Sequence, residues 1–458
     1  MHFLILGAGI AGLTAGRELR RYGHQVTIVE KSSTVGGLAR SYERDGYRFD
    51  LGGHRFHSHN PSVIRWLQEL LGDDLLTVTR HSRILLNGRF IPYPLQFPQA
   101  LAALPPHRAL YALGSYLYAQ YRHRHLPDDT FENWITKRFG PVMYNTFFRP
   151  YNQKVWGVNP KNIAAEWGAQ RLTLPNLGQT IRQTIFPNAT PKNNRPPTHF
   201  YYPRYGFGAI PQALATDIER HDGRIITRAN AEKISFTPHE VAISFNTPDG
   251  PQTISADTLI STIPISALRQ LLPQPNNPLP NLDLHYRGFI SLNLILNQET
   301  VSPDLWTYFP DDDFIFGRTH EPKNWSPALV PDPQTTSLGL EIFANPDDHI
   351  WRQSNDQLAQ TAIQQLTRLN WITPDAVQDH WAIRIPHAYP IYDLTYRQRL
   401  QAIKGYFDQW PRLHLLGRTG AFRYMDTDGV IESVFDFLAW QLPEAIRAIN
   451  NDTNNGDL

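Results

Sequence analysis

Three glycines near the N-terminus have the spacing of a loop that binds the phosphates of a dinucleotide. Gly7, Gly9 and Gly12 follow the apolar run 3–6 in the pattern G-x-G-x-x-G, and Glu30 ends the next apolar run. The first glycine permits a tight turn, the second lets a pyrophosphate approach the backbone, and the third lets a helix pack closely on a strand. Glu30 can accept hydrogen bonds from a ribose. The pattern predicts dinucleotide binding, with a purely structural strand–helix–strand turn as the alternative.

A second group of glycines follows soon afterwards. Gly36 and Gly37 come just after Glu30, and Gly52-Gly53-His54 comes a little later. Glycines so near the first motif suggest backbone that lies against another flat, phosphate-bearing part of the same ligand. His54 is placed to tune that ligand or to touch a substrate, with an ordinary loop histidine as the alternative.

The first sixty residues resemble the FAD-binding half of a large flavoprotein group that includes amine oxidases, phytoene desaturases, protoporphyrinogen oxidases and sugar-nucleotide mutases. The resemblance implies FAD as the cofactor. The residues expected to hold it are Gly7, Gly9, Gly12, Glu30, Gly36, Gly37, Arg40, Gly53, Gly417, Arg418, Asp426 and Thr427. Asp428 could orient the same C-terminal turn or simply cap the following helix.

The composition excludes several other functions. The 458 residues include 43 basic and 42 acidic side chains, so no overall charge favours nucleic acid or an anionic membrane surface. The absence of cysteine excludes disulfides and thiolate catalysis, and no metal-ligand cluster stands out. No apolar run reaches the ~18 residues of a membrane span, and the N-terminus lacks the features of a signal peptide. We expect a cytoplasmic protein without a transmembrane segment, and oligomers are possible.

The hydrophobic pattern predicts the elements that position these residues. In chain order it indicates a strand at 3–6, a helix to about residue 22, a strand at 25–29, a helix at 61–71, and a hairpin within 76–90 that turns at Asn87-Gly88. The aromatic-rich stretch 100–148 is expected to form core helices of a small bundle, with a membrane-touching helix as the alternative. The basic cluster 122–125 is interpreted as a solvated helix end.

The rest of the chain predicts a pocket wall, a sheet and a return to the first domain. Residues 148–167 are expected to be loop with a short helix, and 187–199 a mobile, proline-rich loop within a possible substrate flap at 173–199. The later pattern predicts a helix at 206–221, strands over 224–262, an antiparallel sheet over 282–387 with one helix at 356–369, and a strand at 412–416 before a glycine turn and a helix.

The predicted fold class is α/β: a Rossmann-type FAD-binding domain with an inserted helical domain and an inserted antiparallel β-sheet domain. The FAD-binding parts are assigned to 1–80, 200–280 and 405–450, the mainly helical nucleotide-binding insertion to 81–185, the substrate sheet to 281–404, and a disordered tail to 451–458.

Six segments together resemble the UDP-galactopyranose mutase family, whose members interconvert the pyranose and furanose forms of a UDP-sugar. They are YPLQ from Tyr93, FRPYNQKVW from Phe148, AEWGAQR from Ala165, WTYFPDDDFIFGR from Trp306, AYPIYD from Ala388 and GRTGAFRYMDTDGVI from Gly417. They occur in family order across nearly the whole chain. Leu95 replaces an aromatic residue of the family, and His57 falls where one branch has phenylalanine, which leaves the nucleotide and sugar open.

The resemblance implies roles for the side chains of these segments. Arg171 and Arg318 would bind the substrate diphosphate through bidentate guanidinium contacts, with a surface position or a structural ion pair as the alternative. Tyr308, Tyr389 and Tyr424 would donate hydrogen bonds from their phenol hydroxyls to the diphosphate, and His54 would lie nearby. A uracil slot would be formed by Tyr93, Gln96, Phe147 and Asn152. Ordinary packing is the alternative for the tyrosines and for the slot.

The function that the resemblance implies is isomerisation without net redox change. The N5 atom of reduced FAD would attack the anomeric carbon of an NDP-sugar, most simply UDP-galactose, through a covalent flavin–sugar adduct, and dithionite or NAD(P)H could supply the reduction. An FAD-dependent oxidoreductase of an amine, porphyrinogen or polyene is the first alternative. A non-catalytic FAD- or nucleotide-binding protein is the second.

Overall fold

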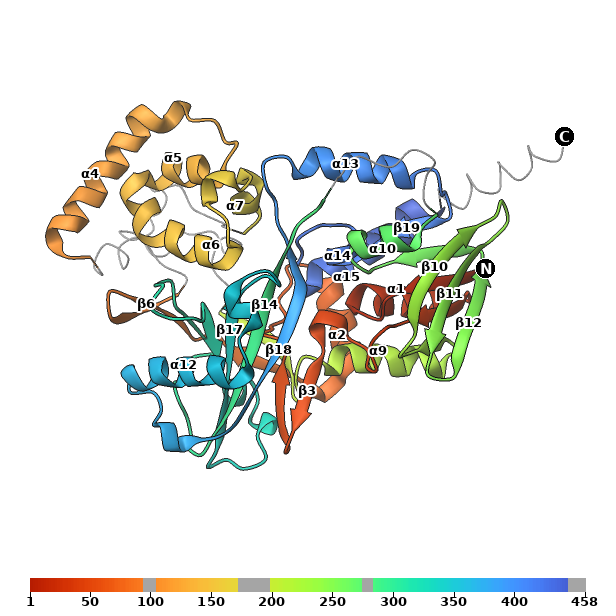
Figure 1. Ribbon diagram of the computed structural model, residues 1–458, viewed down its shortest axis with the longest axis horizontal. Helices are drawn as coiled ribbons and strands as arrows, with labels where there is room; N and C mark the ends of the chain where they lie inside the picture. The colour runs from red at the N-terminus through yellow and green to blue at the C-terminus, as the bar shows by residue number, and fades with distance from the viewer. Residues whose placement is uncertain (94–103, 172–197, 274–282, 444–458) are drawn as a thin grey trace.

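A parallel sheet gathers the first and the last strands of the chain. The computed structural model describes residues 1–93, 104–171, 198–273 and 283–443 (Figure 1). Five strands form this sheet in the order β19-β13-β1-β2-β9, and every neighbouring pair is parallel. They are β1 (His2–Leu6), β2 (Gln25–Val29), β9 (Arg224–Ile226), β13 (Thr258–Ser261) and β19 (Leu413–Leu415). The predicted return of the chain to its first domain is therefore confirmed.

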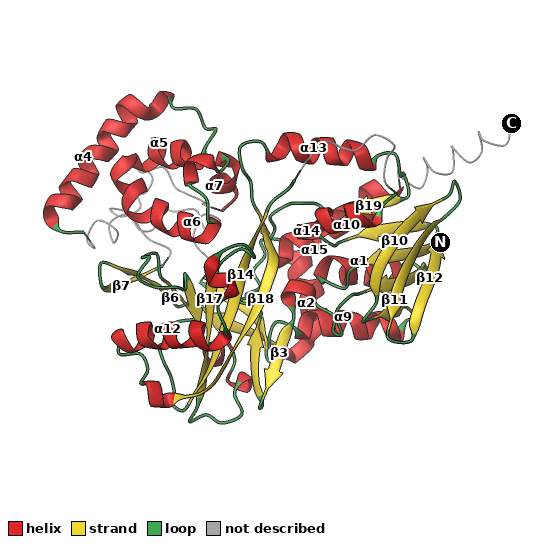
Figure 2. Cartoon of the chain, in the orientation of Figure 1, coloured by secondary structure: helices red, strands yellow, loops and turns green. Residues whose placement is uncertain are grey.

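Alternating side chains of β1 pack on two different layers. Phe3 and Ile5 join the core beneath the helices, whereas Leu4 and Leu6 face the opposite core, as the two-residue period of a strand requires. The helix layer consists of α1 (Ile10–Arg21), α2 (Pro61–Leu71), α9 (Ala209–Arg220) and α15 (Thr427–Asp436). The other layer is the antiparallel meander of β10 (Asn230–Phe236), β11 (Val241–Thr247) and β12 (Gly250–Ala256). Figure 2 shows this three-layer domain beside a second sheet.

The second sheet has seven strands in the order β18-β14-β17-β16-β15-β6-β7. They are β6 (Ser82–Leu86), β7 (Arg89–Pro92), β14 (Tyr286–Leu296), β15 (Trp306–Tyr308), β16 (Arg318–His320), β17 (Thr336–Phe343) and β18 (Val377–Pro390). All neighbours are antiparallel except β6 and β15. The helix α12 (Asn355–Arg368) lies where a helix was predicted, packs on one face of this sheet, and is capped by Ser354 and Gln357.

The Asn87-Gly88 hairpin is confirmed, but it begins later than predicted and belongs to the large sheet. The segment β5 (Leu75–Thr79) pairs instead with β8 (His199–Pro203), and only residues 82–92 form the hairpin. The predicted helical insertion at 81–185 includes the two hairpin strands, β6 and β7. In the structure β6 pairs with β15, so the hairpin lies in the large sheet. The domain boundaries themselves stay a prediction.

A separate group of helices covers one end of the large sheet (Figure 1). It contains α4 (Pro106–Arg122), α5 (Phe131–Met143), α6 (Arg149–Trp156) and α7 (Ala165–Arg171). The prediction of loop with a short helix over 148–167 is confirmed in outline: α6 is that helix, loop and a single 3-10 turn follow it, and only the start of α7 lies in this range. Non-helical backbone at Gly140, followed by Pro141, bends α5 at its contact with α4. The expected small bundle is present, because α4 packs on α5, but only one face of α4 is buried and its other large side chains are exposed.

The remaining elements are short or connect the layers. They are β3 (Ser41–Arg44), β4 (Tyr47–Asp50), α10 (Ile265–Leu271), α11 (Pro322–Trp325), α13 (Tyr396–Phe407) and α14 (Gly417–Gly420). Among the described residues no helix is long and apolar enough to cross a membrane. The predicted flap, apart from residues 198 and 199, and the C-terminal tail lie outside the described residues.

Candidate functional site

Three glycine segments meet at the start of α1. A Cβ atom on Gly12 would lie 2.0 Å from the Gly7 carbonyl oxygen, so only glycine allows the helix to approach the strand so closely. Gly36 donates its N–H to the Ala8 carbonyl at 2.7 Å. A Cβ atom on Gly417 would lie 2.7 Å from the Ala11 side chain. Segments separated by hundreds of residues therefore form one cradle around the helix N-terminus.

The cradle has the features that a bound pyrophosphate requires. A Cβ atom on Gly9 would meet nothing within 4 Å, so open space lies over this turn, and α1 has no side-chain cap. The Arg40 side chain contacts Ser32, and its Nε atom is buried without a partner among the described residues. A buried, unpaired guanidinium nitrogen and a glycine-lined space fit an anionic ligand such as the pyrophosphate of FAD.

Glu30 is fixed by the backbone on both sides. Its carboxylate accepts the Ala8 N–H at 2.8 Å and the Ser32 N–H at 2.7 Å, which orients it at the end of β2. The side chain is half-buried and each oxygen keeps a free lone pair, so it can still accept from a ribose hydroxyl. That contact stays a prediction.

The turn at Gly52-Gly53-His54 is tied to the large sheet. A Cβ atom on Gly53 would lie 1.9 Å from the Trp306 Nε1 atom, and the Gly53 N–H donates to the Glu341 Oε1 atom at 2.8 Å. The His54 Nδ1 atom lies 3.1 Å from the Gly52 carbonyl oxygen, and burial lowers the pKa of His54. His54 stacks on Phe207. The imidazole is thus held neutral and fixed beside the turn.

Arg318 forms a buried ion pair behind this turn. Its Nε and Nη2 atoms donate to the two Glu341 carboxylate oxygens at 2.9 and 2.6 Å, and the two side chains are 16% and 0% exposed. Burial opposes both charges, but the pairing raises the pKa of Arg318 and lowers the pKa of Glu341. The structural ion pair that was the alternative for Arg318 is therefore present, and the same carboxylate also holds the Gly53 backbone.

Aromatic side chains surround this ion pair. Tyr93 lies 4.3 Å from Tyr308 between ring centroids, and Tyr308 is in turn close to Arg318. Tyr389 and Tyr424 are stacked, and the Arg418 guanidinium lies over both, 4.8 and 4.3 Å from their centroids. The structure brings these predicted residues together at the junction of the glycine cradle and the large sheet.

Other predicted residues are less clearly placed in the site. Phe147 is buried in the core, and the Asn152 side-chain amide donates to the Phe148 carbonyl, so both have a structural role. Asp426 is exposed and accepts from the Tyr424 hydroxyl, and Thr427 begins α15. Arg171 ends α7, but its side chain, like all of Gln96, lies outside the described residues.

Two arginines of the site were missed by the sequence reasoning. The Arg55 Cζ atom lies 4.8 Å from the Phe200 ring centroid and 5.2 Å from the Trp306 centroid, on the ring that Arg318 also contacts. Arg80 lies over Phe200, and its Nε atom is buried without a partner. Neither has an ion-pair partner in the described part of the chain. The position of Arg55 directly after Gly-Gly-His was the only available signal.

We expect the stability of the fold to depend on pH because of the buried side chain of His320. Burial lowers its pKa to about 4, from an ordinary value of 6.5, and neither ring nitrogen has a partner among the described residues. Below pH 6.5 the unfolded chain binds a proton that the folded chain does not, so stability should fall by up to about 1.4 kcal/mol per pH unit toward pH 4. His320→Leu should reduce this slope in urea unfolding, and exposed His239→Gln should not. Equal slopes for all three proteins would contradict the assignment.

The comparisons with known proteins agree with this geometry. The family model for flavin-containing amine oxidoreductases matches residues 10–433. The crystal structure of a reduced UDP-galactopyranose mutase superimposes with a TM-score of 0.82 at 25% identity, covering 96% of this chain and 95% of that one. A putative protoporphyrinogen oxidase from Exiguobacterium sp. 255-15 has the same fold, with a TM-score of 0.73 at 18% identity over 94% and 96% of the chains.

The sequence relatives match shorter parts. A probable UDP-galactopyranose mutase from Klebsiella pneumoniae is 24% identical over 36% of this chain and 43% of its own length. An L-amino-acid oxidase from Siganus canaliculatus is 45% identical over 16% of this chain and 14% of its own length. The matched segments thus span less than half of either curated relative. The predicted fold class and the resemblance to the mutases are confirmed.

Proposed function

Because the chain belongs to the family of flavin-containing amine oxidoreductases, we propose that it is a mutase that uses reduced FAD to interconvert the pyranose and furanose forms of an NDP-sugar. UDP-galactose is the first substrate to test. The resemblance to a reduced UDP-galactopyranose mutase over nearly both chains supports this choice. We place the activity in the cytoplasm, where NAD(P)H could act as reductant.

The observation that carries the proposal is the excess of positive charge beside the glycine turn. Arg55 lies over both Phe200 and Trp306, Arg80 lies over Phe200, and Arg318 lies over Trp306. Glu341 is the one carboxylate bonded to these arginines among the described residues. Two positive charges are thus left in excess. A sugar diphosphate carries about two negative charges, so it would be bound and stabilised as a leaving group. A cationic amine would be repelled by the same charges.

Each group of residues has a role in this proposal. The cradle at Gly7, Gly9, Gly36 and Gly417, with Arg40 and Glu30, would hold the FAD, which supplies a nucleophilic N5 atom when bound and reduced. Arg318 and Arg171, together with Arg55 and Arg80, would hold the diphosphate during cleavage of the anomeric bond. Tyr308, Tyr389 and Tyr424 would donate hydrogen bonds to it, and Tyr93 with Gln96 would hold the base.

A redox comparison tests the proposal. NDP-sugars, with UDP-galactose first, are incubated with dithionite-reduced and with oxidised protein, and ring-contracted product is separated by chromatography. We expect product with the reduced protein alone, because only reduced flavin has a nucleophilic N5 atom. Equal turnover in both redox states would contradict the proposal. Oxygen consumption with an amine or a polyene, unchanged by Arg318→Ala, would instead support the oxidoreductase that the family also includes.

A further inference from the structure

The helix α4 exposes an apolar and aromatic face. Of the eleven large hydrophobic side chains that are exposed in the described part of the chain, six lie on this one helix. They are Leu110, Tyr111, Leu113, Leu117, Tyr118 and Tyr121. Leu110, Leu117 and Tyr121 are spaced by seven and four residues, and therefore share one face of the helix. Contiguous exposure of this kind marks an interaction surface.

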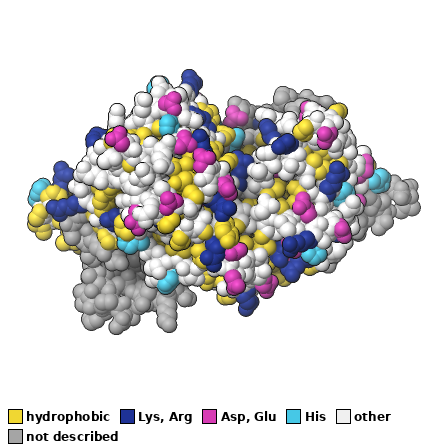
Figure 3. Space-filling model, turned by 90° about the horizontal axis from the view of Figure 1, so that it is seen from below, with side chains coloured by type: hydrophobic (Ala, Val, Ile, Leu, Met, Phe, Trp, Pro, Cys, Tyr) yellow, Lys and Arg dark blue, Asp and Glu magenta, His cyan; other side chains and the backbone are white. Residues whose placement is uncertain are grey.

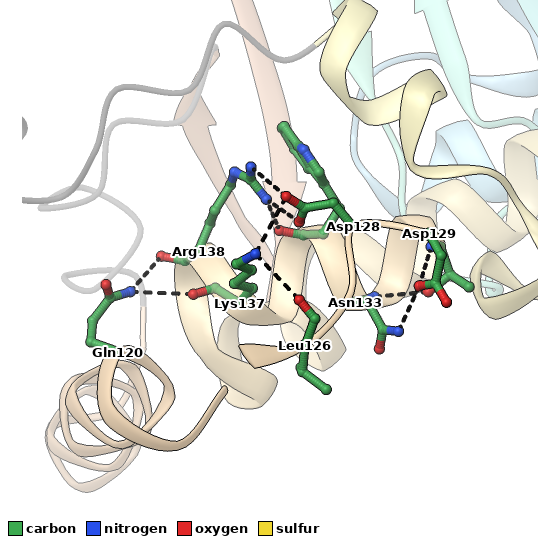
Figure 4. Close-up of polar contacts among 9 residues, drawn as sticks. Gln120, Leu126, Asp128, Asp129, Asn133, Lys137 and Arg138 are labelled. Carbon is green, nitrogen blue, oxygen red and sulfur yellow. Dashed lines mark hydrogen bonds and ion pairs between the residues drawn. The ribbon is translucent and has the colours of Figure 1, made fainter. Parts of the chain in front are cut away.

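The opposite face of α4 already has its partner. Ala112, Ser115 and Ala119 are small and buried, and a Cβ atom on Gly140 would lie 2.8 Å from the Ser115 carbonyl oxygen, so α4 packs closely on α5. Near the end of α4, the Gln120 amide donates to the Lys137 and Arg138 carbonyls (Figure 4). The contact with α5 thus uses one side of α4 and leaves the aromatic face outside.

The charged side chains on α4 and just beyond its end have one sign. Residues 104–127 contain no aspartate or glutamate but three arginines, although the chain as a whole is nearly neutral. Arg108 stands near the start of α4, and Arg122 and Arg124 stand at and just beyond its end. Figure 1 places the β6–β7 hairpin, with exposed Arg89, on the same side of the molecule as α4. Figure 3 shows hydrophobic, basic and histidine side chains mixed along that edge.

We propose that α4 docks the protein on an anionic phospholipid surface, lying flat with its aromatic face in the interface. Tyrosine and leucine bury apolar surface at the depth of the headgroups, and arginines extend toward lipid phosphates. Each arginine near such a surface adds to the attraction, which salt weakens. A second copy of the chain fits the face less well: an antiparallel pairing of two α4 helices would bring Arg108 against Arg122 and Arg124, with no carboxylate from 104–127 between them.

Vesicle co-sedimentation of the full-length, FAD-loaded protein tests the proposal. The probes are vesicles of 30% phosphatidylserine in phosphatidylcholine, and vesicles of phosphatidylcholine alone. We expect binding to the anionic vesicles at low salt, with about a tenfold loss on neutral vesicles or at 0.5 M NaCl. Absence of binding to the anionic vesicles, or binding that is indifferent to charge and salt, would overturn the proposal.

Two variants assign the binding to α4. The first double variant, Leu117→Gln with Tyr121→Gln, removes apolar side chains that are 61% and 74% exposed. The second, Arg122→Gln with Arg124→Gln, removes the charges. Each should weaken vesicle binding about tenfold with unchanged flavin content. Tyr22→Gln with Arg220→Gln, at exposed sites elsewhere, is the control. Unchanged vesicle binding by the α4 variants would overturn the proposal. The proposal would also be overturned if the wild-type protein is a dimer and the same substitutions dissociate it.

Discussion

Arg318→Ala is expected to lower kcat/KM for the sugar isomerisation by about 10²–10³-fold and to destabilise the fold by about 3–5 kcal/mol. The substitution removes a charge that would face the diphosphate. It also leaves Glu341, which is fully buried, without its cation. Activity alone could not separate the two effects, so urea unfolding should be measured beside it.

A second substitution separates catalysis from stability. In Arg318→Met with Glu341→Gln no buried charge remains, and the glutamine carbonyl can still accept the Gly53 N–H. Stability should recover most of its loss while kcat/KM stays low. Recovery of both would mean that Arg318 serves only the fold. Arg44→Ala breaks an ion pair whose side chains are 46% and 31% exposed, and should leave activity unchanged at a cost of less than about 1 kcal/mol.

Gly12→Ala is expected to abolish flavin binding. The added Cβ atom would lie 2.0 Å from the Gly7 carbonyl oxygen, a backbone atom that cannot move without displacing the strand or α1. Purified protein should lack visible flavin absorbance, because the glycine loop and the helix N-terminus would no longer be aligned for the pyrophosphate. Full flavin content in this variant would contradict the placement of the cofactor.

Gly9→Ala distinguishes ligand contact from folding. Its Cβ atom would enter open space, so the fold should be retained while FAD affinity falls about tenfold or more, because the methyl group would occupy the approach of the phosphates. Gly405→Ala, in α13, also meets open space but lies in a helix interior, where alanine should stabilise by up to about 1 kcal/mol. Unaltered FAD affinity in Gly9→Ala would place the pyrophosphate elsewhere.

Local patterns in the sequence were sufficient to predict most individual elements. The helix at Pro61–Leu71 has the predicted ends because Asn60 caps it and Pro61 occupies its first turn. The G-x-G-x-x-G turn and the hairpin at Asn87-Gly88 follow from backbone conformations that glycine favours. Alternating apolar residues likewise located the antiparallel sheet. The residues that dictate each of these features are neighbours in the chain, so spacing alone identifies them.

Only the tertiary structure decided which distant groups meet. The sequence indicated Arg318 but not Glu341, whose carboxylate neutralises it. Nor did it indicate that Arg55 approaches Trp306 and that Arg80 approaches Phe200. It predicted helix at α4 and left open, only as an alternative to a core position, that the aromatic side of that helix faces outward. The hydrophobic pattern of the sequence indicates that a helix has two different faces. Which elements cover those faces depends on how the whole chain packs. For the same reason the net charge of the site could be counted only after its side chains were placed in space.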